Sequence, residues 1–209
     1  MKSILNQEIE KIKNSYTLEH FRNKEFYTEW LAQTYFFVRH STRLLNLSAA
    51  LTPFELQFYH LRANEHAHEE RSHEKLIDLD LKSFGTKIEN FKELPSTKSF
   101  YQTQYYHIQH VHPLSFLGYV LVLETLAITL GKELVPIVEE CHGKKTSAFL
   151  RLHAQEDIEH IDSLMKVFDA LPRSLTELIA ENLTQSAFLY RDIIKNISDE
   201  KLISNKKVA

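Results

Sequence analysis

Residues 153–160 read HAQEDIEH, and residues 66–73 read HAHEERSH. Both stretches place an acid four residues after a histidine and a second histidine three residues after the acid. On an α-helix these three positions fall within roughly 60° of one another, because successive residues turn by about 100°. Each stretch is therefore predicted to be helical and to direct two imidazoles and one carboxylate the same way. The six side chains are His66, Glu70 and His73 in one stretch and His153, Asp157 and His160 in the other.

A seventh candidate, Glu124, lies inside the apolar run Leu117–Ala127. Its neighbours at helical offsets are all apolar, and a bare carboxylate buried among them would be strongly unfavourable. We therefore expect Glu124 to be protonated, paired with a base or bound to a cation. The wider apolar stretch Leu114–Gly131 is only just long enough to span a membrane and carries this acid near its middle, so it is interpreted as a buried helix of a soluble protein.

The rest of the sequence predicts an all-α protein with one domain over residues 1–209. Only 4 glycines and 5 prolines are present, and no alternating β-branched runs indicate strands. Residues 52–55, TPFE, have the pattern of a capping box with proline at the first helical position. We expect seven helices, at about Ile4–His20, Glu25–Leu47, Pro53–Lys82, Phe100–Val111, Pro113–Glu140, Lys145–Leu171 and Ser174–Ile197.

The seven candidate side chains exceed the three or four protein ligands that a single metal ion needs, so they suit two ions bridged by a carboxylate. Imidazole and carboxylate without thiolate form the ligand set of iron or manganese in oxygen chemistry, although zinc binds the same groups. Two alternatives stay open at this point. Both triplets could be solvated charged faces, and Glu124 could form a lone salt bridge. Glu69 is an alternate for Glu70.

The overall charge and the cysteine content exclude several classes of protein. The formal net charge is -3, without the basic surplus typical of nucleic-acid binding. The single cysteine, Cys141, cannot form an internal disulfide, and the charged N-terminus MKSILNQEIEKIK lacks the apolar core of a signal peptide. We therefore expect a cytoplasmic protein that binds neither nucleic acid nor a membrane.

Other polar residues give weaker indications. His107, His110 and His112 precede Pro113 and are interpreted as a surface or hinge cluster, because helical geometry does not converge them. His40 is interpreted as making a plain polar contact rather than as an axial haem ligand. A catalytic role for Cys141 would need an orienting base and an acid, and nothing else in the sequence supports one.

The chain resembles the haem-oxygenase-like di-metal oxidases, seven-helix proteins that lack haem and hold two metals on three core helices. The resemblance rests on residues 66–73, on Leu117-Gly118-Tyr119 through Glu124, and on the histidine–acid–histidine pattern of residues 153–160. It covers about residues 35–171. One departure concerns the first core helix, which in the family usually reads Glu, six residues, His. Here His66 stands where that glutamate would be, so either His66 itself is a ligand or Glu70 (or Glu69) supplies the carboxylate.

The resemblance implies an enzyme with two Fe ions, or Mn or a mixed Fe/Mn pair, that activates O2 to oxidise a small organic substrate. Known members act on amines, amino acids or fatty acids. A homodimer is a mild expectation from the fold family. Competing hypotheses are a ferritin-like di-iron protein with Glu29 as an inward carboxylate, a haem-binding oxygenase, a thiaminase-type hydrolase using Cys141, and a helical interaction module without catalysis.

Overall fold

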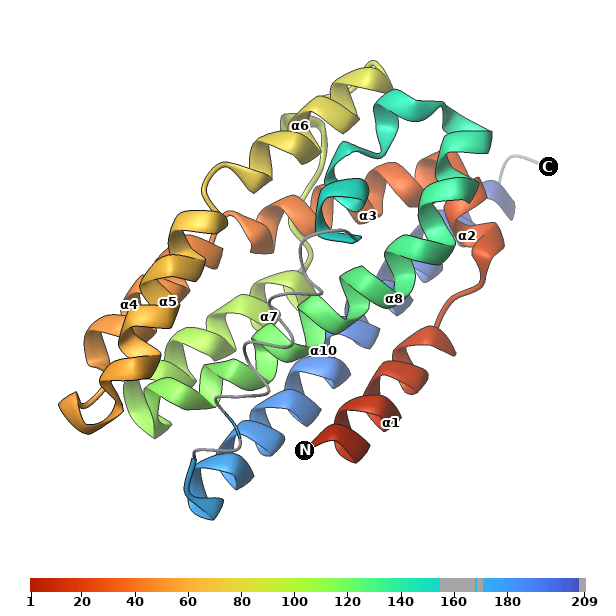
Figure 1. The fold of residues 1–209 in the computed structure, drawn as a ribbon. Coiled ribbons are helices and arrows are strands. Elements are labelled where there is room, and N and C mark those ends of the chain that lie inside the picture. Colours follow the sequence, from red (N-terminus) through yellow and green to blue (C-terminus); the bar gives the residue numbers. More distant parts are fainter. Residues whose placement is uncertain (155–167, 169–170, 207–209) are drawn as a thin grey trace.

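The computed structural model describes residues 1–154, 168 and 171–206, and these residues form helices and connecting turns without a β-strand (Figure 1). The α-helices are α1 (Lys2–Lys13), α2 (Leu18–Arg22), α3 (Lys24–Val38), α4 (Ser41–Leu51), α5 (Gln57–Glu69), α6 (His73–Ser83), α7 (Pro95–Tyr106), α8 (Leu117–His142) and α10 (Arg173–Lys206). Short helical turns are η1 (Phe54–Leu56), η2 (Ile88–Asn90), η3 (His107–Val111), η4 (Pro113–Phe116) and η5 (Lys144–Thr146). The prediction of an all-α fold is confirmed.

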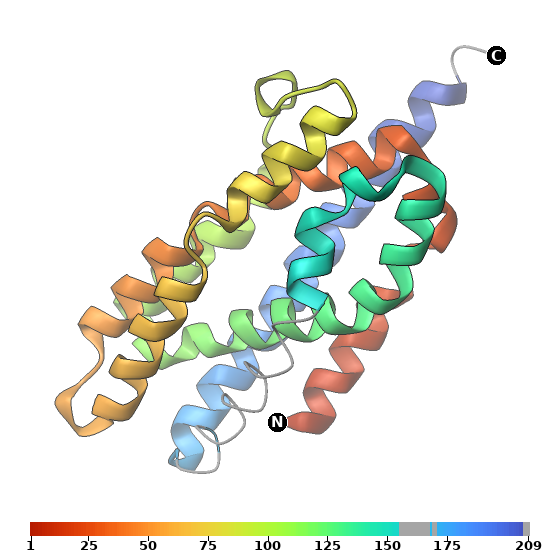
Figure 2. The ribbon, with the colours of Figure 1, turned by 45° about the horizontal axis from the view of Figure 1, so that its top comes forward.

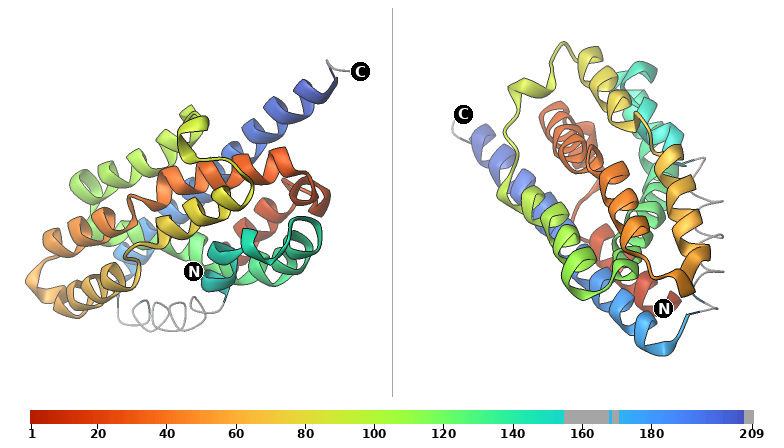
Figure 3. Two further views of the ribbon diagram at one scale, coloured as in Figure 1. Left: turned by 90° about the horizontal axis from the view of Figure 1, so that it is seen from above. Right: turned by 90° about the vertical axis from the view of Figure 1, so that its left-hand side faces the viewer.

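The helix α3 lies inside the molecule, between α6 on one side and α7 and α10 on the other (Figure 3). Twelve of its fifteen residues are buried, and eight of these are apolar or aromatic, as expected for a helix that is surrounded by others. The helices α4 and α5 form an antiparallel pair at one end of the molecule (Figure 1). The core is therefore arranged around α3 and the largely buried first half of α8.

Several predicted helices are interrupted in the structure. The predicted helix Ile4–His20 is divided into α1 and α2, and Glu25–Leu47 is divided into α3 and α4 at Arg39–His40. The predicted helix Pro53–Lys82 is divided into η1, α5 and α6. At the break between α1 and α2, Ser15 Oγ donates to the carbonyl of Ile12 over 2.6 Å, a local hydrogen bond that competes with continuation of the helix.

The predicted capping box at residues 52–55 is wrong. The Thr52 hydroxyl donates to the carbonyl of Ser48 over 2.7 Å, so it completes the end of α4 instead of starting the next helix. Pro95 begins α7, five residues before the predicted start at Phe100, since a proline at the first helical position sacrifices no hydrogen bond. The predicted helix Lys145–Leu171 lies largely outside the described residues.

The long apolar helix from Pro113 to His142 has the length and composition of a membrane span, with a mean hydropathy of 1.8. Within the protein, 72% of its most apolar window is buried. Such burial is typical of the core helix of a globular protein, as the sequence predicted. Beyond Gly143 the chain turns, and the helix that starts at residue 148 runs back along α8, where Ala154 meets Gly131 (Figure 2).

Candidate metal centre

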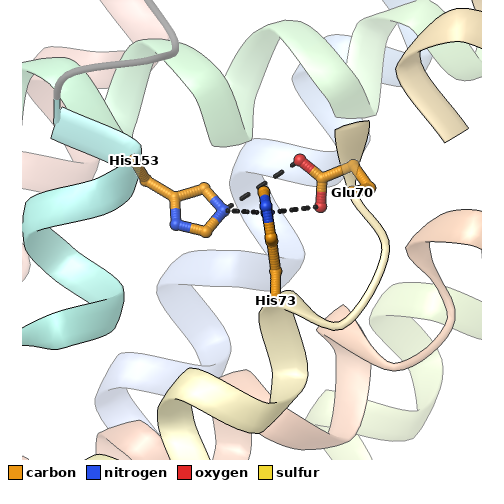
Figure 4. Close-up of side chains that lie close together, drawn as sticks. All are labelled: Glu70, His73 and His153. Atoms are coloured by element: carbon orange, nitrogen blue, oxygen red, sulfur yellow. Dashed lines mark hydrogen bonds and ion pairs between the residues drawn. The ribbon is translucent and has the colours of Figure 1, made fainter. Parts of the chain in front are cut away.

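Three of the seven predicted side chains converge on one point, Glu70, His73 and His153 (Figure 4). One ligand atom from each lies within 4.8 Å of the others. His73 Nδ1 is 3.2 Å from His153 Nε2 and 3.5 Å from Glu70 Oε2, and His153 Nε2 is 4.0 Å from Glu70 Oε1. Their side chains are only 11–12% exposed. Residues 80 positions apart in the sequence thus share one largely buried point.

A second pair adjoins this group. His66 Nε2 lies 3.0 Å from Glu124 Oε1 and 3.7 Å from Glu70 Oε1. The side chains of His66 and Glu124 are 6% and 7% exposed. Glu70 therefore lies between the His66–Glu124 pair and the two other histidines. We refer to His66, Glu70, His73, Glu124 and His153 as the five-residue cluster.

The first part of the cluster is assembled by a break in the chain and not by one continuous helix. The helix α5 ends at Glu69, and α6 begins at His73. Between them Ser72 adopts a left-handed conformation with φ 73°. The prediction that one helical face presents His66, Glu70 and His73 is therefore wrong in its geometry. The three side chains meet because the turn redirects the start of α6 toward the end of α5.

The orientation of His153 is set by the beginning of its helix. The buried Asp80 carboxylate on α6 accepts hydrogen bonds from the backbone amides of Ala148 (2.8 Å) and Phe149 (3.0 Å). It thereby satisfies amides that a helix start leaves without partners. His153 Nδ1 lies 3.0 Å from the carbonyl of Phe149, which can only accept, so Nδ1 carries the hydrogen. The lone pair on Nε2 then faces Glu70 and His73, as a metal ligand requires.

The charges of the cluster depend on one another. Burial opposes protonation of His66, but the neighbouring Glu124 and Glu70 outweigh it and raise the pKa of His66 to about 10. Burial would raise the pKa of Glu70, but the contacts with His66 and His73 hold it far below its usual range. The two buried carboxylates, Glu70 and Glu124, thus create a negative potential that favours a positive charge beside them. A bound metal cation fits this potential, and the imidazole nitrogens can serve as its ligands.

The structure distinguishes Glu70 from its alternate Glu69. Glu69 lies at the surface, where Oε2 is 3.0 Å from Arg62 Nη1, whereas Glu70 faces the cluster. Asp157 and His160, the remaining predicted side chains, lie outside the described residues. Their place relative to the cluster stays a prediction.

The weaker candidates lie elsewhere. His107 Nε2 is 2.7 Å from Gln185 Oε1, and His112 accepts from the backbone amide of Leu114, so both make structural contacts. His40 contacts the Tyr105 hydroxyl over 2.9 Å, as expected for a plain polar contact. Cys141 is exposed and meets Arg22, and Glu29 accepts from Gln33 within α3. Neither Cys141 nor Glu29 is among the described residues lining the cavity beside the cluster.

That cavity has a volume of about 100 Å³, and four cluster residues (His66, Glu70, Glu124 and His153) form part of its wall. The rest of its described lining is almost entirely apolar or aromatic, from α3, α4, η4, α8, α10 and the helix starting at residue 148. A small organic molecule inside it would contact the cluster directly.

Comparison with known proteins places this arrangement in a family. A family model described as iron-containing redox enzyme matches residues 28–190. The chain belongs to this iron-containing redox enzyme family. The matched range includes all seven predicted site residues, and membership agrees with the resemblance found in the sequence. A search of curated proteins found none that matches this chain.

Two solved structures share the fold of this protein. One is a domain of unknown function with a heme oxygenase-like fold from Shewanella denitrificans OS217, with a TM-score of 0.87 and 18% identity, covering 98% of this chain and 93% of that one. Another is a TenA homologue from Pyrococcus furiosus, with a TM-score of 0.65 and 14% identity, covering 93% and 99%. At these identities the likeness concerns the fold alone. It favours the haem-oxygenase-like fold over the ferritin-like bundle.

Proposed function

We propose that this protein is a non-haem di-iron oxidase that uses O2 to oxidise a small organic substrate. The observation that carries the proposal is the five-residue cluster: three imidazoles and two carboxylates, mostly buried, beside an apolar cavity. Membership in an iron-containing redox family makes iron the preferred metal over zinc. Mn or a mixed Fe/Mn pair is the alternative.

Each cluster residue has a distinct position from which it would hold metal. Glu70 has His66 and His153 near Oε1 (3.7 and 4.0 Å) and His73 near Oε2 (3.5 Å), so it is the carboxylate that would be shared by two ions. His66 and Glu124 would serve one ion, and His73 and His153 the other. Asp157 and His160 are proposed to complete the ligand set. Ferrous iron held there would supply the electrons for reducing dioxygen, which protein side chains do not supply.

The protein's own contribution is to fix the ligands and to exclude water. The carbonyl of Phe149 holds the ring of His153 in one tautomer, and Asp80 anchors the helix that carries it. The apolar wall formed by residues such as Phe149, Leu150 and Val120 keeps bulk water from the reacting groups. The substrate is bound by shape and apolar contact, next to the metal ligands.

The proposal includes a cytoplasmic location and a homodimer, without nucleic acid or membrane as partners. Light scattering of the purified protein measures the oligomeric state, and a monomer would contradict the dimer.

The test is anaerobic loading with Fe(II), followed by elemental analysis and oxygen uptake. We expect about two iron ions per wild-type chain and oxygen consumption on exposure to air. Glu70→Ala and His153→Ala should lose most of the iron and the oxygen uptake. The matched controls are Glu69→Ala and His68→Ala, which alter exposed side chains on the same helix as His66. Equal iron and equal uptake in His153→Ala and wild type would contradict the proposal.

A further inference from the structure

Gly131 is a glycine in the interior of α8 whose backbone does not require one. Of the four glycines in the chain, Gly85 and Gly143 have positive φ angles and follow the ends of helices, whereas α8 runs through Gly131 without a break. Glycine weakens the interior of a helix compared with alanine, because it loses more conformational freedom on folding. The presence of Gly131 is explained instead by what packs against it.

The helix that carries His153 packs directly on Gly131 (Figure 2). A Cβ atom added at Gly131 would lie 2.5 Å from the Cβ of Ala154 and 3.3 Å from its Cα. Two carbon atoms in ordinary contact are about 3.5–4.0 Å apart, so the added atom would force the two helices about 1 Å apart. Neither Cβ atom could rotate out of the way, because each is bonded directly to its backbone. The missing side chain at Gly131 thus permits the close approach of the two helices.

Both helices at this contact carry residues of the five-residue cluster. His153 directly precedes Ala154, and Glu124 is seven residues before Gly131. Seven residues make almost two complete turns, so Glu124 and Gly131 lie on the same face of α8, about 10 Å apart along its axis. The contact at Gly131 therefore sets the distance between the face of α8 that holds Glu124 and the helix that holds His153.

The spacing of the histidines already suits a metal ion. His153 Nε2 lies 3.2 Å from His73 Nδ1. Two ligand atoms bonded to one ion at about 2.1 Å are about 3.0–3.4 Å apart in octahedral or tetrahedral geometry. Metal–ligand bond lengths vary by only about 0.2 Å. Because Asp80 holds the start of the His153 helix to α6, a displacement of about 1 Å at Ala154 would tilt this helix and take His153 out of range.

We propose that Gly131 is a positioning residue of the metal centre. It lets the helix of His153 lie close enough to α8 for His153 and Glu124 to hold neighbouring ions, and it acts through its contact with Ala154. The inference rests on the proposed function, because the five-residue cluster is taken as the metal site.

The test measures iron affinity without turnover. Full-length protein is titrated anaerobically with Fe(II) in a calorimeter, and its melting temperature is measured without metal. The solutions contain sucrose, which favours the folded state, so that folded variants are compared. In Gly131→Ala the affinity for iron should fall about 10- to 100-fold, the usual effect of changing residues that orient metal ligands.

The matched variant is the exchange Gly131→Ala/Ala154→Gly, which has the composition of wild type. The new Cβ then has the Cα of residue 154 as its nearest neighbour, at 3.3 Å, a distance that small shifts accommodate. Helix propensity lost at one position is regained at the other. The exchange should therefore recover most of the iron affinity that Gly131→Ala loses.

The control for stability is Ile9→Ala, which removes packing from α1, a helix without cluster residues. It should lower the melting temperature and leave iron affinity unchanged.

Wild-type iron affinity in Gly131→Ala would overturn the inference, as would an exchange variant that binds iron no better than Gly131→Ala. An equal loss of affinity in Ile9→Ala would also overturn it, because affinity would then follow stability alone. A Gly131→Ala protein that is unfolded even in sucrose would assign Gly131 to the stability of the fold and overturn its positioning role. Failure of wild type to bind iron is a separate result that contradicts the proposed function.

Discussion

Ser72 carries the backbone conformation on which the shape of the cluster depends. Its φ of 73° lies in the left-handed region, which is unfavourable for residues with a Cβ atom and more so for β-branched ones. Ser72→Val should therefore destabilise the protein by about 1–2 kcal/mol, whereas Ser72→Gly should stay within about 1 kcal/mol of wild type. Urea unfolding measures both. Because the Ser72 side chain is exposed, lost packing is not an explanation, and equal stabilities of the two variants would contradict the strain.

His40 makes stability depend on pH. Burial, with the charges of Arg39 and Arg43, lowers its pKa to about 4, below the ordinary 6.5. The native state therefore binds this proton less tightly than the unfolded state does. Stability is full above about pH 6.5 and falls as the pH drops toward 4. The ring also stacks on Tyr101 at 4.0 Å between centroids, so His40→Gln should lower stability at pH 7.

The measurement for His40 is urea unfolding of wild type and His40→Gln at pH 7, 5.5 and 4. Glutamine cannot take up the proton, so the difference in free energy of unfolding between the two proteins should shrink as the pH falls. A constant difference across this range would show that His40 does not titrate as its surroundings indicate.

At the scale of helices, the sequence was sufficient for the fold class and insufficient for the breaks. Long apolar periodicity and few glycines predicted an all-α protein. The structure adds a reason for Gly118, because a Cβ there would come within 2.4 Å of the α10 backbone at Ile179 and Leu183. The break at residues 70–72 has no glycine or proline to mark it. It depends on contacts with residues distant in the sequence, such as His153, which a local pattern does not contain.

Part of the candidate site was predictable from the sequence. Glu124 was found because it is an acid in an apolar run, and His66, Glu70, His73 and His153 were found by the spacing of their histidines and acids. The choice of Glu70 over Glu69 depends on the turn after α5 and required the structure.

Also at the scale of helices, we predict that Asp80 stabilises the protein by linking α6 to the helix of His153. The Asp80 carboxylate accepts two backbone amides and is fully buried, and burial, only partly offset by these amides, raises its pKa to about 6. Asp80→Ala leaves both amides without partners and should cost about 2–3 kcal/mol. Asp80→Asn keeps one acceptor oxygen and should cost less. Urea unfolding at pH 7.5 measures both, and an Asp80→Ala variant as stable as wild type would contradict this role.

At the scale of the whole molecule, the cluster joins segments that are far apart in the sequence. His66 belongs to α5, His73 to α6, Glu124 to α8 and His153 to the helix starting at residue 148. Unfolding separates these ligands, so a metal ion that bridges them binds the native state almost exclusively. Such binding raises the free energy of unfolding by about 2.7 kcal/mol when free metal is at 100 times its Kd.

For a chain of this length, that stabilisation corresponds to a rise in Tm of about 5–10 °C on adding Fe(II) anaerobically, measured by scanning calorimetry. Glu124→Ala should show a much smaller rise, and Glu140→Ala, an exposed acid on the same helix, should show the wild-type rise. An equal rise in Glu124→Ala would mean that iron binds elsewhere.

Since the ligands come from both halves of the chain, metal should shift one cooperative transition as a unit. Two transitions, of which only one shifts, would contradict the predicted single domain over residues 1–209.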